Sequence, residues 1–283
     1  MTKDRWLVWQ KMKAQHAAAA EKLLQSQERW CMNACHRYLN RESMKGRVWV
    51  LEGRGGELQA LVVFVRQALL PVFRGLNKIP SPHFLWSLYG TVPIHSVQGI
   101  TEDALVMEAA LRTLGLPAAQ SNDYDLMCID GAPSDYQTAG PAGLRIRKPE
   151  TRDMDDLIQL HAGYEKEEVL TDSSDFNPVI SRFHTERIIA QEQVLVAEIG
   201  GRLVGKINTN ARAFTRCQIG GVYVHPDYRG RGIAQRMSGE FTASLAAQGL
   251  GVSLFVRKTN DSARRVYERI GFSQAGSYRV SYY

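Results

Sequence analysis

The chain has 283 residues, of which 44% are hydrophobic and 23% charged, and this balance excludes a protein dominated by disorder. No apolar run approaches the roughly 20 residues of a membrane span, and the first residues lack a signal-peptide core, so we expect a cytoplasmic protein without a membrane partner. The formal net charge of +6 is modest, and charge alone therefore does not indicate a nucleic-acid-binding protein.

The first half predicts helices, a hairpin, a later helix and a strand. From Asp4 to about Leu39 the composition favours amphipathic helices. Strand-like runs at 48–51 and 58–65 flank a glycine-rich turn, which is typical of a hairpin. The further elements expected in this half are a loop or edge strand over 69–82, a strand over 85–89, a helix over 102–114 with Thr101 as its N-cap, and a strand over 125–129.

The four cysteines, at positions 31, 35, 128 and 217, show no CxxC spacing. In a reducing compartment such residues are expected as half-buried thiols. Cys31, Cys35 and His36 share one predicted helix and carry metal-ligating atoms, but no fourth ligand group is evident. We therefore expect no metal in this protein.

A segment rich in Gly, Pro, Ser and Ala, residues 131–143, indicates a linker. It predicts two domains, 1–140 and 141–283, since either half is long enough to bury its own core. The second half predicts a strand at 144–146, helices over 153–168 and 179–190, a hairpin of strands 194–199 and 203–208, and a partner strand over 217–224. Beyond residue 234, the second half predicts a strand over 252–256, a short helix that begins at Asn260 or Asp261, and a closing strand over 277–283.

The stretch Gly221 to Ala234 predicts a buried strand, a glycine turn and a helix. Backbone N–H groups at a helix start lack internal partners and attract anions, and glycines let a phosphate approach closely. Arg229 and Arg231 are expected to supply the countercharge. The simpler alternative is a turn in which the two glycines only provide the backbone geometry and bind no anion. Neither a Walker pattern nor a dinucleotide fingerprint is present.

Basic residues concentrate around this stretch: seven lie between Arg202 and Arg236, against the single acid Asp227. The interleaved aromatic residues of nucleic-acid-binding proteins are missing here. The concentration of charge therefore favours a small polyphosphate ligand and no nucleic-acid partner.

The spacing Arg229-x-x-Gly232-x-Ala234 resembles the pyrophosphate-binding signature of the GNAT superfamily of N-acetyltransferases. Asn260 and Tyr267 stand where that family's second cofactor-contacting motif lies, and the resemblance covers about 144–283. It implies an α/β mixed sheet with a C-terminal GNAT fold and a second N-terminal α/β domain. The repeated order of elements favours the hypothesis that the first half is a degenerate, GNAT-like copy, in which the segment 97–100 occupies the corresponding strand-to-helix junction.

The resemblance implies acetyl-CoA as acyl donor and an amine as acceptor. Backbone groups of Val222, Tyr223 and Val224 would pair with the pantetheine arm. The pyrophosphate would rest at the turn and the first helical residues, with Asn260 as a further cofactor contact. The residues of that turn are Arg229, Gly230, Arg231, Gly232, Ile233 and Ala234.

Acyl transfer needs a base for the amine and an acid for the thiolate. Tyr267 resembles the family's acid, although its position also suits an aromatic packed in the core. Glu168 is the expected base, because partial burial would raise its pKa. A solvated acidic turn formed with Glu165 and Glu167 is an alternative, and His161 and His225 are further candidates.

The predicted function is therefore an acyl-CoA-dependent N-acetyltransferase, acting as a monomer or homodimer on a small-molecule or peptide amine. The alternative is a non-catalytic acyl-CoA sensor, which would tolerate loss of Tyr267. A nucleic-acid-binding protein is the third interpretation. The acceptor stays open, since the same core serves peptides, amino acids, aminoglycosides and polyamines.

Overall fold

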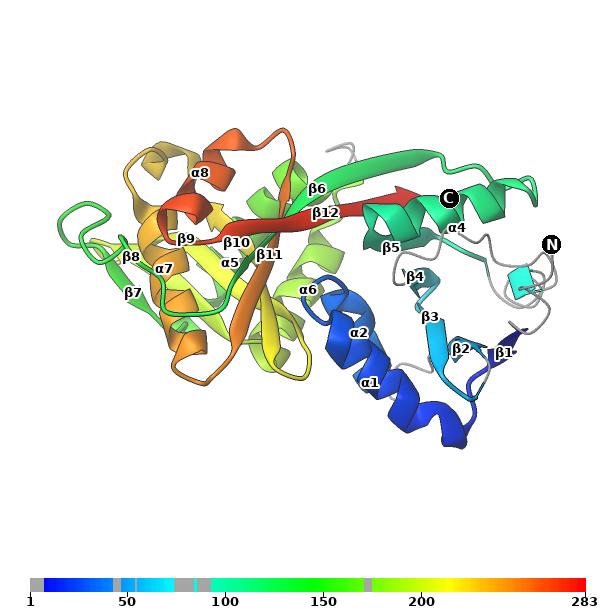
Figure 1. Cartoon of the computed structure of the whole chain (residues 1–283). Coiled ribbons are helices and arrows are strands. Elements are labelled where there is room, and N and C mark those ends of the chain that lie inside the picture. Colours follow the sequence, from blue (N-terminus) through cyan, green and yellow to red (C-terminus); the bar gives the residue numbers. More distant parts are fainter. Residues whose placement is uncertain (1–7, 43–46, 54, 74–83, 86–92, 171–174) are drawn as a thin grey trace.

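The structure is a computed structural model, and it describes residues 8–42, 47–53, 55–73, 84–85, 93–170 and 175–283. The described strands form a single 12-stranded sheet in the order β1-β2-β3-β4-β5-β12-β6-β11-β10-β9-β8-β7. Helices cover both of its faces (Figure 1). In this part of the chain, no helix has the length and apolar character required to cross a membrane.

The first half of the chain contributes β1 to β6 and three described α-helices. Their bounds are β1 (Val8–Lys11), α1 (Ala17–Gln27), α2 (Met32–Leu39), β2 (Arg47–Glu52), β3 (Leu58–Val65), β4 (Ala68–Val72), β5 (Ser96–Ile100), α4 (Thr101–Arg112) and β6 (Gln120–Ile129).

The second half repeats this order and has helix α7 between its fourth and fifth strands. Its elements are β7 (Arg145–Arg147), α5 (Met154–Tyr164), α6 (Pro178–Gln191), β8 (Val194–Ile199), β9 (Arg202–Arg212), β10 (Arg216–Val224), α7 (Ile233–Ala246), β11 (Gly251–Arg257), α8 (Asp261–Arg269) and β12 (Ser273–Tyr282). The corresponding stretch of the first half lies mostly outside the described residues.

The two halves exchange their last strands. β6, from the first half, pairs antiparallel with β11 of the second half, whereas β12 pairs antiparallel with β5 of the first half. β6 and β12 also pair with each other along their length, and both run from one half to the other in Figure 1. The sheet of each half is therefore completed by a strand of the other half.

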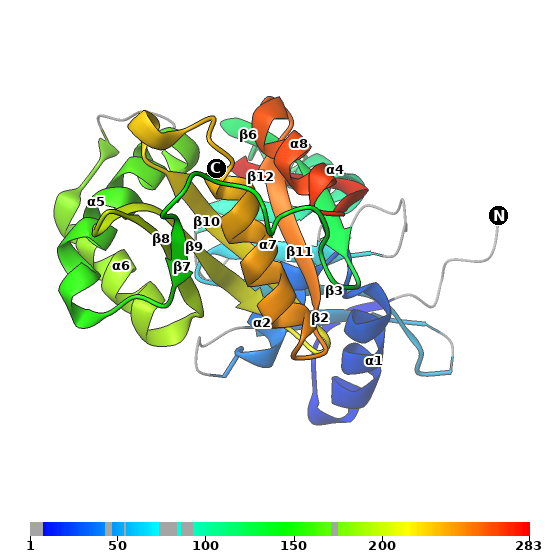
Figure 2. The same ribbon diagram turned by 90° about the vertical axis from the view of Figure 1, so that its left-hand side faces the viewer.

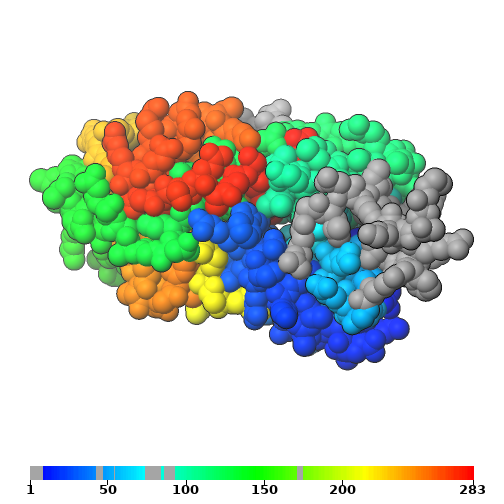
Figure 3. Space-filling model, viewed as in Figure 1, coloured from blue at the N-terminus to red at the C-terminus, as the bar shows by residue number. Residues whose placement is uncertain are grey.

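Helices of the first half also reach the end of the chain. Trp30 donates its indole N–H to the carbonyl of Ala275 at 3.1 Å, and the Asn33 amide donates to the Tyr278 hydroxyl at 3.2 Å. Figure 3 shows the same proximity, with the blue N-terminal helices against the red C-terminal segment.

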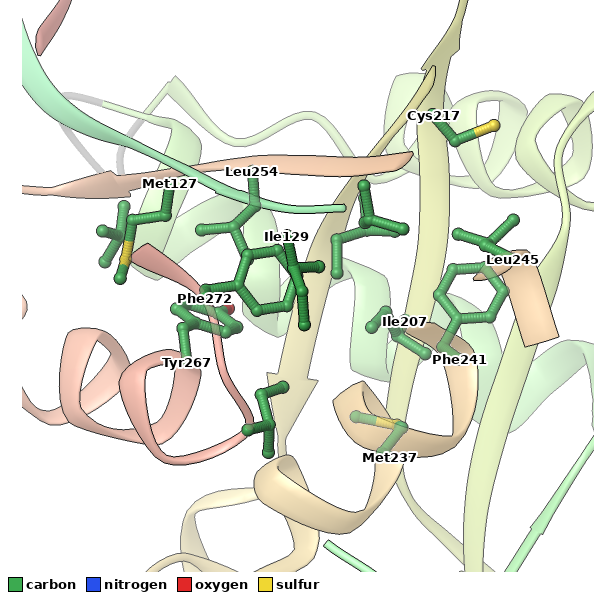
Figure 4. Close-up of a cluster of buried hydrophobic side chains, with 14 of the residues drawn as sticks. Met127, Ile129, Ile207, Cys217, Met237, Phe241, Leu245, Leu254, Tyr267 and Phe272 are labelled. Atoms are coloured by element: carbon green, nitrogen blue, oxygen red, sulfur yellow. The ribbon is translucent and has the colours of Figure 1, made fainter. Parts of the chain in front are cut away.

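Alternating strand side chains produce a separate core on each face of the sheet. In the second half, Leu157 and Leu160 of α5 pack with Val196 and Tyr223. The opposite face packs α7 and α8 against β9 to β11, as Figure 4 shows for Met237, Phe241 and Tyr267. The first half is built in the same way, with α1 and α2 on one face and α4 on the other. The period of two along β-strands explains this division.

The segment between β6 and β7 contains neither helix nor strand, as predicted for a linker, and it crosses α7 (Figure 2). A Cβ on Gly239 of α7 would overlap the Tyr136 ring, and a Cβ on Gly232 would lie 2.8 Å from the Gly140 nitrogen. The chain passes this close to α7 because both helix positions are glycine. The domain limits 1–140 and 141–283 remain a prediction.

Several expectations for the first half need correction. Residues 8–11 form strand β1 instead of helix, because pairing with β2 outweighs local helix propensity. β4 is a central strand between β3 and β5, although Pro71 suggested a loop or edge. Ile100 precedes α4 as its N-cap, and Thr101 is its first helical residue. The strand expected over 85–89 falls mainly outside the described residues.

The junction at 97–100 was also matched to the wrong element. It joins β5 to α4, which corresponds by chain order to β11 and α8 and not to the glycine turn before α7. By the same order, the position that corresponds to the turn follows β4, in a stretch mostly outside the described residues.

Candidate functional site

The site is organised by the separation of two parallel strands, β10 and β11. They pair only from Arg216 to Gln218, opposite 251–253, although β10 continues to Val224 and β11 to Arg257. On its other edge β10 stays paired with β9 as far as Val224, with a register shift between Gly220 and Tyr223. Residues 219–224 therefore have a backbone edge that β11 does not cover.

The register shift places Gly221 in a left-handed conformation, with φ of 58°. A Cβ at this position would overlap the side chain of Asn208. Glycine is thus required both for the backbone angle and for the packing. The bulge therefore bends β10 within the segment whose edge β11 does not cover.

The turn after β10 leads into the N-terminus of α7. Gly230 and Gly232 have φ of 73° and 78°, and Gly232 is the N-cap of the helix. In the described part of the chain, the backbone N–H groups of 230–234 donate to no carbonyl outside helical pairing, and the first N–H groups of a helix have no internal acceptor. These amides and the helix dipole have the arrangement that favours binding of an anion.

The two arginines of the turn have different surroundings. Arg229 donates Nε–H to the Val224 carbonyl at 2.9 Å and its terminal nitrogen to Glu167 Oε2 at 2.8 Å. Its charge is therefore paired with Glu167 in this structure, and its expected role as a countercharge for the anion remains a prediction. Arg231 donates to the Asp227 carbonyl at 3.1 Å, and no carboxylate partner is found for it among the described residues.

Glu167 links this turn to the opposite face of the sheet. The Tyr223 hydroxyl donates to Glu167 Oε1 at 2.8 Å. A Cβ on Gly163 would clash with the Tyr223 ring, so the tyrosine fits only beside a glycine. Glu167 therefore has a structural role between Tyr223 and Arg229.

The structure brings Glu168 and Asn260 together. Both predicted residues meet where α5 ends in a π-helical turn, Glu165–Val169, a feature frequent at functional sites. Asn260 Nδ2 lies 3.3 Å from Glu168 Oε1, while its Oδ1 accepts from the Ala263 N–H at 3.1 Å and caps α8. Asn260 thus caps α8 and contacts Glu168 at the same time, and its expected contact with the cofactor remains a prediction.

Burial raises the pKa of Glu168, and the nearby Glu167 charge raises it further, against the opposing effect of Arg257. Arg257 is a residue that sequence reasoning missed. It donates to the Glu168 carbonyl at 2.7 Å and holds the π-helical turn in place.

Tyr267 lies on α8 and is 7% exposed. Its ring meets Phe272 edge to face at a centroid distance of 5.9 Å, so the core-packing interpretation describes its ring correctly (Figure 4). Burial raises the pKa of its hydroxyl above the usual range, with further contributions from Tyr164 and Glu168. The hydroxyl thus keeps its proton.

Lys206 is a second residue that sequence reasoning missed. It is 3% exposed, and its Nζ donates to the Gly221 carbonyl at 2.9 Å and to Asn208 Oδ1 at 3.3 Å. Burial lowers the pKa of its amine to about 7. The sequence around Lys206 predicts only a strand. Its burial could not be predicted, because the Gly221 carbonyl that accepts its hydrogen bond belongs to the bulge of a different strand, β10.

The histidines considered as bases are not next to Glu168. His225 accepts from the Asp227 N–H at 3.4 Å and caps the turn 226–228. His161 is buried on α5, and burial lowers its pKa to about 4. Neither residue shares a hydrogen bond with Glu168, Asn260 or Tyr267 in the described structure.

Comparisons with known proteins agree with this geometry. The model of the acetyltransferase (GNAT) family matches residues 155–272. An acetyltransferase of Sodalis glossinidius is 37% identical over 87 residues, which are 29% of this chain and 58% of that protein. One of Pectobacterium atrosepticum is 35% identical over 81 residues, covering 28% of this chain and 55% of the relative. The chain thus spans somewhat more than half the length of these relatives.

Solved structures extend the likeness of fold to nearly the whole chain. A GCN5-related N-acetyltransferase from Sphaerobacter thermophilus has a TM-score of 0.55 at 20% identity and covers 99% of this chain and 96% of its own. A tandem GNAT protein from the clavulanic acid biosynthesis pathway has a TM-score of 0.56 at 12% identity, covering 97% of both chains. The chain therefore shares its fold with a tandem GNAT protein, and residues 155–272 in its C-terminal part match the acetyltransferase (GNAT) family.

Proposed function

We propose that the protein transfers an acetyl group from acetyl-CoA to a primary amine by direct attack through a tetrahedral intermediate. The observation that supports this most is the uncovered edge of β10, which leads at one end to the amides before α7. Glu168 and Asn260 meet beside Arg257 at the end of β11, and Tyr267 lies on α8, the helix that Asn260 caps. The arrangement suits a long ligand with a diphosphate at one end and a reactive carbonyl at the other.

The residues present fit coenzyme A in two respects. The edge of 219–224 offers backbone groups to the pantetheine amides, as an added strand would. The glycines at 230 and 232 allow a diphosphate to reach the amides of 230–234, beside Arg231. Acetyl-CoA supplies the activated acyl group, and the chain supplies orientation and proton transfer.

In the proposed reaction Glu168 removes a proton from the acceptor ammonium. The amine nitrogen then attacks the thioester carbonyl carbon, whose oxygen takes the negative charge in the tetrahedral intermediate. As the carbonyl re-forms and the C–S bond breaks, the sulfur leaves with its electron pair and takes the Tyr267 proton. The nitrogen, which carries a positive charge after the attack, loses its second proton to water to give the neutral amide, while Tyr267 regains a proton from water and Glu168 releases its own. Asn260 positions Glu168 through its 3.3 Å contact, and the buried tyrosine remains a proton donor.

Thiol release tests the proposal. The full chain is incubated with acetyl-CoA and one class of amine at a time: peptides, amino acids, polyamines or aminoglycosides. Free thiol is measured against a control without protein. Amine-dependent release with at least one class is expected. Binding of CoA by calorimetry without release for any amine would favour the sensor, and no binding would contradict both functions.

A glycine substitution tests the anion site. Gly230 and Gly249 have φ of 73° and 76°, and a Cβ at either would meet nothing within 4 Å. Gly230→Ala and Gly249→Ala should therefore destabilise the fold by a similar amount, about 1 kcal/mol. Only Gly230→Ala should weaken CoA binding, by about tenfold, since its methyl group hinders the phosphate. Calorimetry with CoA measures this, and equal affinities for the two variants would contradict the assignment.

The pH dependence of the rate tests Glu168. A base acts only when deprotonated, and its pKa is raised, so kcat/KM should rise with pH through that pKa. Glu168→Gln should lower kcat/KM by about tenfold to 100-fold near neutral pH and remove this rise. Glu186→Gln, on an exposed carboxylate paired with Arg182, is the control and should keep the wild-type profile. An unchanged profile for Glu168→Gln would exclude it as the base.

A further inference from the structure

Three metal-ligating side chains meet between α5 and α6, on a part of the second half that the proposed reaction does not use. His161 and Glu165 are four residues apart and share one helix face, and His184 approaches from α6. Glu165 Oε1 lies 2.9 Å from His184 Nδ1 and 3.3 Å from His161 Nε2. The ligand atoms of all three residues lie within 4.8 Å of one another.

His161 is the unusual member of this group. It is only 5% exposed, yet neither ring nitrogen makes a hydrogen bond within the described structure. The separation from Glu165 is short, but its geometry is not that of a hydrogen bond. Buried polar atoms normally have partners, and an unpaired one costs about 1–3 kcal/mol. A ligand between the three side chains would bind the Nε2 atom, which faces Glu165.

We propose that His161, Glu165 and His184 bind a divalent transition-metal ion of the zinc type. Two imidazoles and one carboxylate form a donor set that zinc accepts, and a fourth position is left for water. With bonds of 2.0–2.2 Å in tetrahedral geometry, the ligand atoms must lie roughly 3.3 Å apart. The two separations from Glu165, 2.9 and 3.3 Å, are at or below this value, whereas the histidine nitrogens lie within 4.8 Å of each other, so the His184 ring would have to move towards His161 when the ion binds.

The access and the charges around the cluster are compatible with a bound cation. The side chain of His184 is 38% exposed, whereas those of His161 and Glu165 are 6% and 13% exposed, so an ion can enter from the His184 side. Lys206 is the neighbouring cation and opposes metal binding while protonated. Burial lowers its pKa to about 7, and metal binding is therefore measured at pH 8.

A bound ion would connect α6 to the end of α5. Glu165 is the first residue of the π-helical turn that also carries Glu167 and Glu168. The ion would thus fix the segment that positions the proposed base without touching the acyl group. Metal binding does not require acyl transfer, and either proposal can fail without the other.

Zinc and cobalt titrations of the full chain test the site. Calorimetry with Zn²⁺ should show one site per chain, and Co²⁺ should give the intense visible absorption of a tetrahedral centre. His184→Ala removes a partly exposed ligand and should fold, and it should bind Zn²⁺ at least tenfold more weakly. Glu165→Gln keeps the side-chain shape and should weaken binding similarly.

His95→Ala is the control, because His95 is exposed and lies outside the cluster. It should bind Zn²⁺ as the wild type does. The proposal is wrong if the wild-type protein binds neither metal, if His184→Ala retains wild-type affinity, or if His95→Ala loses as much affinity as His184→Ala.

Discussion

A chain that begins at residue 141 is expected not to fold, although it retains the whole GNAT family match. Without the first half, β11 loses its neighbour β6, and β12 loses both β5 and β6. Unpaired, apolar strand edges are exposed to solvent and promote aggregation. Circular dichroism and thermal unfolding should show no cooperative transition for residues 141–283, whereas the full chain should unfold cooperatively.

A chain that begins at residue 117 is the matched comparison. It restores β6 beside β11 and β12 but still lacks β5 and the helices of the first half. We expect it to recover a cooperative transition at a lower temperature than the full chain. If residues 141–283 alone unfolded cooperatively near the full-chain temperature, the exchanged strands would not be needed for stability.

The sequence predicted the second half more accurately than the first because its local signals agree with its tertiary structure. The glycine turn and the hairpin around Gly200 and Gly201 use residues whose own preferences match their conformation. The same holds for α7, whose buried apolar residues recur at helical spacing. In the first half, β1 lies in a segment of helical composition, and Pro71 lies in a central strand. There, pairing with distant strands decides the structure, and no local pattern reports it.

The exchange of β6 and β12 was beyond sequence reasoning for the same reason. Both segments were predicted as strands, but a period of two indicates only which faces are buried, not which neighbour a strand pairs with. The predicted linker remains compatible with the structure, because the segment after β6 is irregular. The two halves are held together by the pairing of β6 with β11 and of β12 with β5, and not by the linker.

The candidate site was partly predictable. Residues close in sequence to the signature, such as Gly230 and Gly232, were found because the motif itself requires their conformations. Lys206 and Arg257 were missed because their roles come from contacts with the Gly221 and Glu168 carbonyls on other elements. The ion pair of Arg229 with Glu167 likewise joins two elements far apart in the chain.

Tyr267→Phe is expected to lower kcat by about 100-fold to 1000-fold, the usual contribution of a general acid. The substitution removes only the hydroxyl, so the edge-to-face contact with Phe272 is preserved. The pKa of the Tyr267 hydroxyl is raised by burial, and its proton is therefore available at every pH at which the amine can be deprotonated. Steady-state thiol release measures kcat, and calorimetry should give the wild-type affinity for CoA.

Tyr278→Phe provides the control, since Tyr278 is also buried, at 1% exposure, and its hydroxyl accepts a hydrogen bond from Asn33 of α2 and, within the described residues, shares none with Glu168 or Asn260. This variant should lose some stability, about 1 kcal/mol for the hydrogen bond, and keep its kcat. The pair of variants separates the two roles of a buried tyrosine. If Tyr267→Phe lost stability but retained kcat, Tyr267 would be a core aromatic, and the leaving thiolate would have to take its proton from water or depart unprotonated.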